Sequence, residues 1–243
     1  MYGLTDKVAI VTGASGGIGR GIAERLAQEG AVVVVNYGKR EDQAGEVVRG
    51  IEARGGKAVA VQADLGRVDD ARRLVRDTVA RFGRLDILVN NAGITLEKPL
   101  VETTEQEFDR IFAVNAKGPY FALQEAAKVI VDGGRIVNIS TAATRAAFAG
   151  ATAYVGSKAA LEQFTKGLAH ELAPRGVTVN NVSPGFTDTP MMWDSLRETA
   201  VAMTPLKRLG RPDDIAAVVA FVVSDEARWL TGQTIQAAGG AVM

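Results

Sequence analysis

Short runs of β-branched residues alternate with longer segments of helical periodicity along the chain, and this alternation constrains the fold more than any other feature of the sequence. Near-continuous apolar strands separated by helices are typical of a parallel sheet that is covered on both faces. We therefore predict a single-domain, doubly wound α/β fold with a sheet of about seven parallel strands. The strands are predicted over 8–11, 32–35, 58–61, 87–89, 135–139, 177–182 and 233–236, and the helices near 17–29, 40–54, 67–81, 104–130, 152–174 and 212–224.

Polar or glycine-rich residues follow the first six predicted strands. In open α/β sheets, ligands bind outside the carboxyl ends of the strands. The preference of turns for polar residues and glycine does not by itself explain this pattern after six strands. We therefore expect a ligand site at this edge of the sheet. The residues concerned are the loop after the first strand, then Asn36-Tyr37, Asp64-Leu65, Asn90-Asn91-Ala92-Gly93, Ser140-Thr141 and Ser183-Pro184-Gly185.

The loop after the first strand, Thr12–Arg20, reads TGASGGIGR and holds four glycines. A helix that begins inside this loop would point its free N–H groups and its positive dipole end at a bound phosphate. The loop fails the G-x-G-x-x-G pattern at Ile22, and it lacks the Gly-Lys-[Ser/Thr] ending of a P-loop. On this stretch alone, a tight turn without a ligand is an equal alternative.

The second predicted strand ends in a neutral residue, Asn36, which is followed by the cations Lys39 and Arg40. Dinucleotide-binding units that prefer NAD usually carry an acidic residue here, whereas a basic side chain accommodates the 2′-phosphate of NADP. The pattern therefore favours NADP(H) over NAD(H). The alternative is that both cations are only solvated charges at a helix start.

Tyr154 and Lys158 are four positions apart in a predicted helix, and this spacing puts both on one face. A phenol with a pKa near 10 is a poor acid–base group at neutral pH until a nearby cation favours its ionised form, and Lys158 can supply that charge. A surface pair is the alternative for an isolated Tyr-x-x-x-Lys. Here the hydroxyls of Ser140 and Thr141 precede Tyr154 by thirteen to fourteen residues at a strand end, which favours a site.

Composition excludes several classes of function. Lys plus Arg equals Asp plus Glu at 28 each, so no basic field exists for nucleic acid or anionic membrane. Cysteine is absent and His170 is the single histidine, so we expect no disulfide, no cysteine nucleophile and no metal site. The longest apolar run, 215–223, is shorter than the roughly 20 residues of a membrane span. We expect a cytoplasmic protein whose partners are small molecules or copies of itself.

Taken in order and spacing, these motifs resemble the short-chain dehydrogenase/reductase family over essentially the whole chain. Within the family, the sequence is similar to ketone reductases related to 3-oxoacyl-carrier-protein reductase and polyhydroxynaphthalene reductase. The residues that carry the resemblance are Thr12-Gly13-x-x-x-Gly17-x-Gly19, Asn90-Asn91-Ala92-Gly93, Asn115, Tyr154-x-x-x-Lys158, Pro184-Gly185 and Thr231-Gly232-Gln233.

The resemblance implies a Rossmann-type domain that transfers a hydride between a nicotinamide and a carbonyl or alcohol carbon. Tyr154 would protonate the carbonyl oxygen, while Lys158 would hold the nicotinamide ribose and lower the pKa of the tyrosine. Asn115 would support a water relay that restores the proton. A hydroxyl at the end of the fifth strand would polarise the carbonyl.

Two positions depart from the family pattern. The usual serine falls on Thr141, which we predict as the catalytic hydroxyl, with Ser140 as the alternative if the loop is shifted by one residue. Gly16 stands where many NADP(H)-using relatives have a basic residue, so recognition of the 2′-phosphate would fall on other residues. The implied cofactor contacts are Gly13, Ser15, Gly16, Gly17, Ile18, Gly19, Asn36, Tyr37, Lys39, Arg40, Asp64, Leu65, Asn91, Ala92, Gly93, Tyr154, Lys158, Pro184, Gly185, Thr187 and Thr189.

The resemblance also implies a substrate lid near 186–204 and a homo-oligomer, a tetramer or a dimer, formed through the two long helices after the fourth and fifth strands. Alanines on these helices, Ala122, Ala126, Ala159 and Ala160, would allow close packing between copies. An apolar substrate pocket would include Phe148, Met191, Met192 and Trp193.

The leading hypothesis is an NADPH-dependent reductase that converts a ketone, β-ketoacyl or other, to a secondary alcohol. An NAD-linked alcohol or sugar dehydrogenase is the second hypothesis, and the end of the second strand discriminates between the two. A non-catalytic NADP-binding regulator is the third, although such proteins often lose the tyrosine or the lysine, and both are present here.

Overall fold

The computed structural model of the chain describes residues 2–192 and 194–241, and it is built on one sheet of seven parallel strands. The strand order is β3-β2-β1-β4-β5-β6-β7, which confirms the predicted doubly wound fold. Most strand residues are apolar and buried, because helices cover the sheet on both faces. The strands are β1 (Val8–Val11), β2 (Val32–Tyr37), β3 (Lys57–Gln62), β4 (Ile87–Asn90), β5 (Arg135–Ile139), β6 (Thr178–Pro184) and β7 (Thr234–Ala237).

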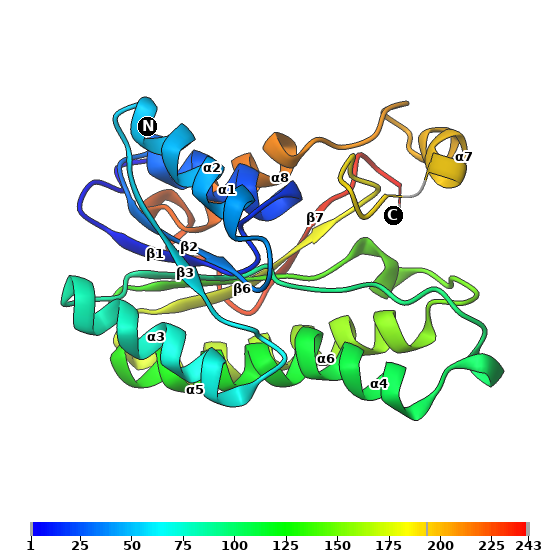
Figure 1. Cartoon of the computed structure of the whole chain (residues 1–243), viewed down its shortest axis with the longest axis horizontal. Helices are drawn as coiled ribbons and strands as arrows, with labels where there is room; N and C mark the ends of the chain where they lie inside the picture. Colours follow the sequence, from blue (N-terminus) through cyan, green and yellow to red (C-terminus); the bar gives the residue numbers. More distant parts are fainter. Residues whose placement is uncertain (1, 193, 242–243) are drawn as a thin grey trace.

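Figure 1 shows two helical layers with the sheet between them. The first layer holds α1 (Gly17–Gln28), α2 (Glu41–Ala53) and α8 (Pro212–Val222). The second holds α3 (Val68–Phe82), α4 (Glu105–Phe112), α5 (Gly118–Val129) and α6 (Thr152–Leu172). One apolar core fills the space between the sheet and each layer. A short helix, α7 (Arg197–Met203), lies beyond the edge of the sheet in the segment that joins β6 to α8.

The chain reverses its direction of travel across the sheet between β1 and β4, which are hydrogen-bonded neighbours. The Thr12 hydroxyl, just after β1, accepts hydrogen bonds from the backbone N–H groups of Asn91 and Ala92, each at 2.9 Å. The glycine loop and the segment after β4 are thereby joined at the switch point, the usual place for a ligand in such sheets.

The prediction of a single helix over 104–130 is wrong, because the structure divides this range into two helices. A π-helical turn, Ala113–Lys117, separates α4 from α5. Such turns carry i→i+5 hydrogen bonds and are frequent at functional sites. The turn holds Asn115, which is completely buried. Apolar periodicity does not reveal a one-turn change of this kind, and it also did not predict α7.

The proposed close packing of copies through Ala122 and Ala126 is wrong. Both side chains are fully buried in the core between the sheet and the second helical layer, so they face inward. The exposed large apolar side chains of this layer include Phe108 and Tyr120. Among the described residues, no helix combines the length and the apolar character that a membrane span needs.

A line of buried polar side chains crosses the sheet beneath α6. Asn90 donates to Asn138 at 2.8 Å, and Asn138 donates to the Thr165 hydroxyl at 2.8 Å. Thr165 in turn donates to Asn181 at 2.6 Å, and Asn181 donates to the Thr234 hydroxyl at 3.0 Å. Because each donor faces an acceptor, this chain holds α6 in one register over β4 to β7.

Replacing Thr165 by valine should lower the free energy of unfolding by roughly 2–4 kcal/mol, because it leaves the amides of Asn138 and Asn181 without their partner in the core. Thr165→Ser keeps the hydroxyl and should cost less. Urea unfolding followed by circular dichroism measures both variants. Equal stability of the two would show that the hydroxyl does not hold the helix.

Candidate active site

The candidate site lies where the ends of β4 and β5 meet the beginning of α6. The Lys158 side chain is buried, and its Nζ donates to the Ile139 carbonyl at 2.8 Å. A Cβ on Gly93 would lie 3.2 Å from this Nζ and 3.3 Å from Asn115 Oδ1. Glycine at position 93 therefore lets the segment after β4 approach Lys158 closely.

Thr141 and Ser140 have different partners, as expected for neighbouring residues at a strand end. The Ser140 hydroxyl donates to Glu162 on α6 at 2.6 Å. The Thr141 hydroxyl accepts from the backbone N–H of Ala143 at 3.3 Å, and its interaction with the Tyr154 phenol lowers the pKa of that phenol. This geometry favours Thr141 over Ser140 as the hydroxyl that acts beside the tyrosine.

Burial changes the acid–base properties of both main candidates. It raises the pKa of the Tyr154 phenol above its usual value, and the hydrogen bond from Thr141 partly offsets that rise. Burial also lowers the pKa of the Lys158 ammonium to about 8. In each case the neutral form is favoured in an environment that excludes water. The contribution that lowers the pKa of the phenol thus comes from Thr141, whereas the family resemblance implied Lys158.

Asn115 fixes the positions of the elements that carry the site. Its Oδ1 accepts from the backbone N–H of Ile94 at 2.9 Å, and its Nδ2 donates to the Ile94 carbonyl at 2.9 Å and to the Ser157 hydroxyl at 3.1 Å. The side-chain amide is therefore fully used within the protein. A water relay through Asn115 would have to use its backbone carbonyl, within the π-helical turn.

The glycine loop has the features of a phosphate cradle. Gly13 has φ +62°, and a Cβ there would lie 2.9 Å from Ala92 Cα, so the loop and the segment after β4 need glycine to pack. Gly16 is the N-cap of α1, where no side chain caps the helix and no acidic residue occupies the first turn. A Cβ on Gly16 would have no neighbour within 4 Å. Open space in front of uncapped N–H groups fits an anionic group such as a pyrophosphate.

After β2, the cations Lys39 and Arg40 are available to bind a ligand, whereas the amide of Asn36 is not. The Asn36 side chain is buried: Oδ1 accepts from Gly13 N, and Nδ2 donates to the carbonyls of Tyr37, Val61 and Ala63. Its amide is thus used by the backbone of the protein itself. Lys39 and Arg40 are exposed, and neither forms an ion pair with any residue that the structure describes.

The Tyr37 phenol is also committed elsewhere. It is buried, and burial raises its pKa, as do the charge and the hydrogen bond of Glu41. Of the residues predicted to bind a 2′-phosphate, Lys39 and Arg40 are exposed and Ser15 is half-buried.

Other predicted cofactor contacts follow β3, β4 and β6. Leu65 is buried in the core, and the Asn91 amide donates to the carbonyls of Thr12 and Gly13, so their side chains are used inside the fold. Asp64 accepts from Gly66 N and lies 3.6 Å from Arg110. The Thr189 side chain lies 3.5 Å from where a Cβ on Gly17 would be, which brings the segment after β6 to the glycine loop.

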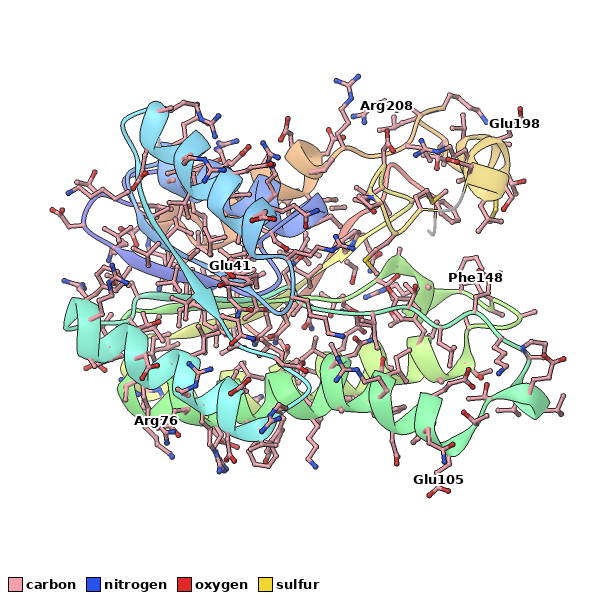
Figure 2. All side chains as sticks on the ribbon, viewed as in Figure 1. Glu41, Arg76, Glu105, Phe148, Glu198 and Arg208 are labelled. Atoms are coloured by element: carbon pink, nitrogen blue, oxygen red, sulfur yellow. The ribbon has the colours of Figure 1, made fainter. Side chains whose placement is uncertain are left out.

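Apolar side chains also lie in the loops that follow β5 and β6. Phe148 and Phe186 come from the loops after β5 and β6 and form an edge-to-face pair with ring centroids 6.5 Å apart. Figure 2 shows Phe148 pointing from its loop toward the side on which α7 lies. Met191 is half exposed, and the predicted pocket residue Trp193 is outside the described residues.

Two polar residues that contact the site were not predicted from the sequence. Ser157 accepts a hydrogen bond from Asn115 and donates one to the Tyr154 carbonyl at 2.6 Å. Glu162 accepts a hydrogen bond from the Ser140 hydroxyl. Helical spacing could have revealed Glu162, because it lies one turn beyond Lys158 on the same face. The remaining candidates lie elsewhere: His170 is exposed on α6, and no group of three potential metal ligands occurs in the described part of the chain.

Comparison with known proteins identifies relatives over the whole length. Residues 13–242 match the family model described as enoyl-(acyl carrier protein) reductase. The chain is 43% identical over 242 residues to the 3-oxoacyl-[acyl-carrier-protein] reductase FabG of Staphylococcus aureus, with 98% of each chain covered. It is 40% identical to the hydroxynaphthalene reductase-like protein Arp2 of Metarhizium brunneum, covering 98% of this chain and 96% of that protein.

A solved structure of the angucycline C-6 ketoreductase LanV with bound NADP superposes with a TM-score of 0.95. The two proteins are 44% identical, and the match covers 99% of this chain and 97% of that chain.

Lys158→Met should raise the free energy of unfolding at pH 7 by roughly 1–3 kcal/mol while abolishing the acid–base site. The pKa of Lys158 is about 8 in the folded chain and about 10.4 when unfolded, so the buried charge is a cost below pH 8 that disappears as pH rises toward 10.4. The variant's advantage should therefore shrink between these pH values. Urea unfolding at pH 7 and pH 10 measures it, and a less stable variant at pH 7 would contradict the account.

Proposed function

Because the chain belongs to the short-chain dehydrogenase/reductase family, we propose that it is an NADPH-dependent reductase that converts a ketone to a secondary alcohol. The observation that carries this proposal is the convergence of Tyr154, Thr141 and Lys158 at the sheet edge beside the glycine loop. Nothing else in the described part of the chain brings an acid, a hydroxyl and a cation together at a dinucleotide cradle.

When bound, NADPH would supply the hydride that the carbonyl carbon of the substrate accepts. Tyr154 gives its proton to the carbonyl oxygen, so that negative charge does not accumulate there. Thr141 directs its hydroxyl at the same oxygen and polarises it. Lys158, whose pKa is about 8, would hold the nicotinamide ribose. The products are the alcohol and NADP⁺, with one proton taken from solvent to restore Tyr154.

The cofactor preference rests on charge at the end of β2. Lys39 and Arg40 are exposed and unpaired within the described residues, so their cationic side chains are free to bind a phosphate. The first turn of α2 holds Glu41 and Asp42, so the helix terminus itself does not add to this attraction. The bound NADP in the related ketoreductase LanV supports the same preference. The family's usual basic residue at position 16 is absent, so these two cations carry the selectivity.

The substrate would enter between the loops that carry Phe148 and Phe186, under a lid near 186–204. An apolar approach of this kind suits a β-ketoacyl group or a cyclic ketone. We further propose that the enzyme works in the cytoplasm as a homo-oligomer, with exposed Phe108 and Tyr120 among the residues that meet another copy.

The purified protein should oxidise NADPH when given a panel of cyclic ketones, β-ketoesters and β-ketoacyl thioesters. Tyr154→Phe removes the acid and should lower kcat by roughly 10²- to 10⁴-fold, because that is the usual contribution of a positioned acid. NADPH affinity, measured by fluorescence, should be unchanged. Normal turnover in this variant would refute the mechanism.

Lys39→Ala combined with Arg40→Ala should weaken NADPH binding by roughly 10- to 100-fold and leave NADH binding unchanged, because only NADPH carries the 2′-phosphate. Isothermal titration with both nucleotides measures this. The matched control is Arg54→Ala with Lys57→Ala. It removes one cation just after the C-terminal end of α2 and one at the start of β3. A parallel loss of affinity for both nucleotides would show that these cations do not read the phosphate.

A further inference from the structure

Glu162 gathers hydroxyl groups from three segments around the site. Its Oε1 accepts from Ser140 at 2.6 Å and from Thr144 at 2.9 Å, and the Ser183 hydroxyl lies 3.5 Å away. Ser140 follows β5, Thr144 lies in the turn that comes next, and Ser183 is in β6. A single carboxylate thus ties α6 to the ends of two neighbouring strands.

The partners of this carboxylate are unusual, because they are neutral. Glu162 is half-buried and forms no ion pair with any residue between 2 and 192 or 194 and 241. A shielded carboxylate is stabilised by hydrogen-bond donors when no cation is near it, and hydroxyls that donate to a charge form stronger bonds than hydroxyls that donate to a neutral group. The arrangement therefore fixes the hydroxyls firmly as well as the carboxylate.

Two of these hydroxyls bracket Thr141. Ser140 precedes it by one residue and Thr144 follows it by three. The Thr144 hydroxyl can donate either to Glu162 or to the Thr141 carbonyl, both at 2.9 Å. Ser140 donates to Glu162, near the middle of α6, whereas Thr141 interacts with the Tyr154 phenol in the first turn of the same helix. Holding the residues on both sides fixes the direction of the Thr141 side chain.

We propose that Glu162 is a positioning residue, which holds the Thr141 hydroxyl against Tyr154 by clamping Ser140 and Thr144. This inference rests on the proposed ketone reduction at Tyr154, and it adds to it the reason why Thr141 rather than Ser140 acts. Glu162 itself touches neither the reacting atoms nor the cofactor cradle.

Two substitutions separate the acceptor oxygen from the charge. Glu162→Leu removes the acceptor and should lower kcat by roughly 10- to 100-fold, since a displaced catalytic group loses rate on that order. The dissociation constant for NADPH should be unchanged. Glu162→Gln keeps an acceptor oxygen and should stay within about 3-fold of the parent chain. Equal kcat in all three proteins would overturn the proposal.

A double-mutant cycle tests whether Glu162 acts through Thr141. In a Thr141→Ala background there is no hydroxyl to position, so Glu162→Leu should lower kcat no further. If it lowers kcat by the same factor as in the parent chain, the carboxylate acts by another route and the proposal is wrong.

A readout that needs no turnover keeps this proposal separate from the proposed function. Because the Thr141 hydrogen bond lowers the pKa of the Tyr154 phenol, Glu162→Leu should raise that pKa as Thr141→Ala does. Ultraviolet difference titration measures it, with Tyr154→Phe identifying the signal. An unchanged titration would overturn the proposal even in an active enzyme, and the expected shift would support it even if no ketone in the panel were reduced. Should Glu162→Leu fail to fold, Thr144→Val breaks one side of the clamp and should shift the titration in the same direction.

Discussion

The geometry of the site depends on the hydrogen bonds of one buried amide, that of Asn115. It binds the backbone of Ile94 in both directions and donates to Ser157, so it ties the segment after β4 to α6. Ser157 lies next to Lys158 and binds the Tyr154 carbonyl. If this amide moved, the tyrosine and the lysine would lose their relation to the cofactor side of the sheet. The π-helical turn is the local distortion that accompanies this inward placement.

Burial and hydrogen bonding act in opposite directions on the reacting groups. Exclusion of water raises the pKa of Tyr154, which favours the neutral phenol, and lowers the pKa of Lys158 to about 8, which leaves its ammonium group mostly charged at pH 7. A neutral phenol is the form that a reductase needs as an acid. Thr141 then lowers the pKa of the phenol. Glu162 holds the position of Thr141 by binding Ser140 and Thr144. Thr141 therefore adjusts the pKa of the acid, and a different residue, Glu162, positions Thr141.

Much of this organisation could be predicted from the sequence, because apolar periodicity locates strands and the sheet then gathers their ends. The seven strands, the loop at Thr12–Arg20 and the position of Ser140 and Thr141 just after the fifth strand all follow from that reasoning. The sequence could not show that Asn36 turns inward, since an amide can serve a backbone or a phosphate equally well. It could not show that Ala122 faces the core, because small apolar residues suit both a core and an interface. The choice between Thr141 and Ser140 needed the position of Glu162, which only the packed helix supplies.

The most direct test of the account is a crystal structure of the enzyme with NADP⁺ and the alcohol product of an active ketone. The account predicts that the product oxygen lies within hydrogen-bond distance, about 2.6–3.2 Å, of both Tyr154 Oη and Thr141 Oγ1. Ser140 should remain bound to Glu162. A product oxygen that contacts Ser140 instead, or that lies out of reach of Tyr154, would contradict the assignment of the acid and of its partner.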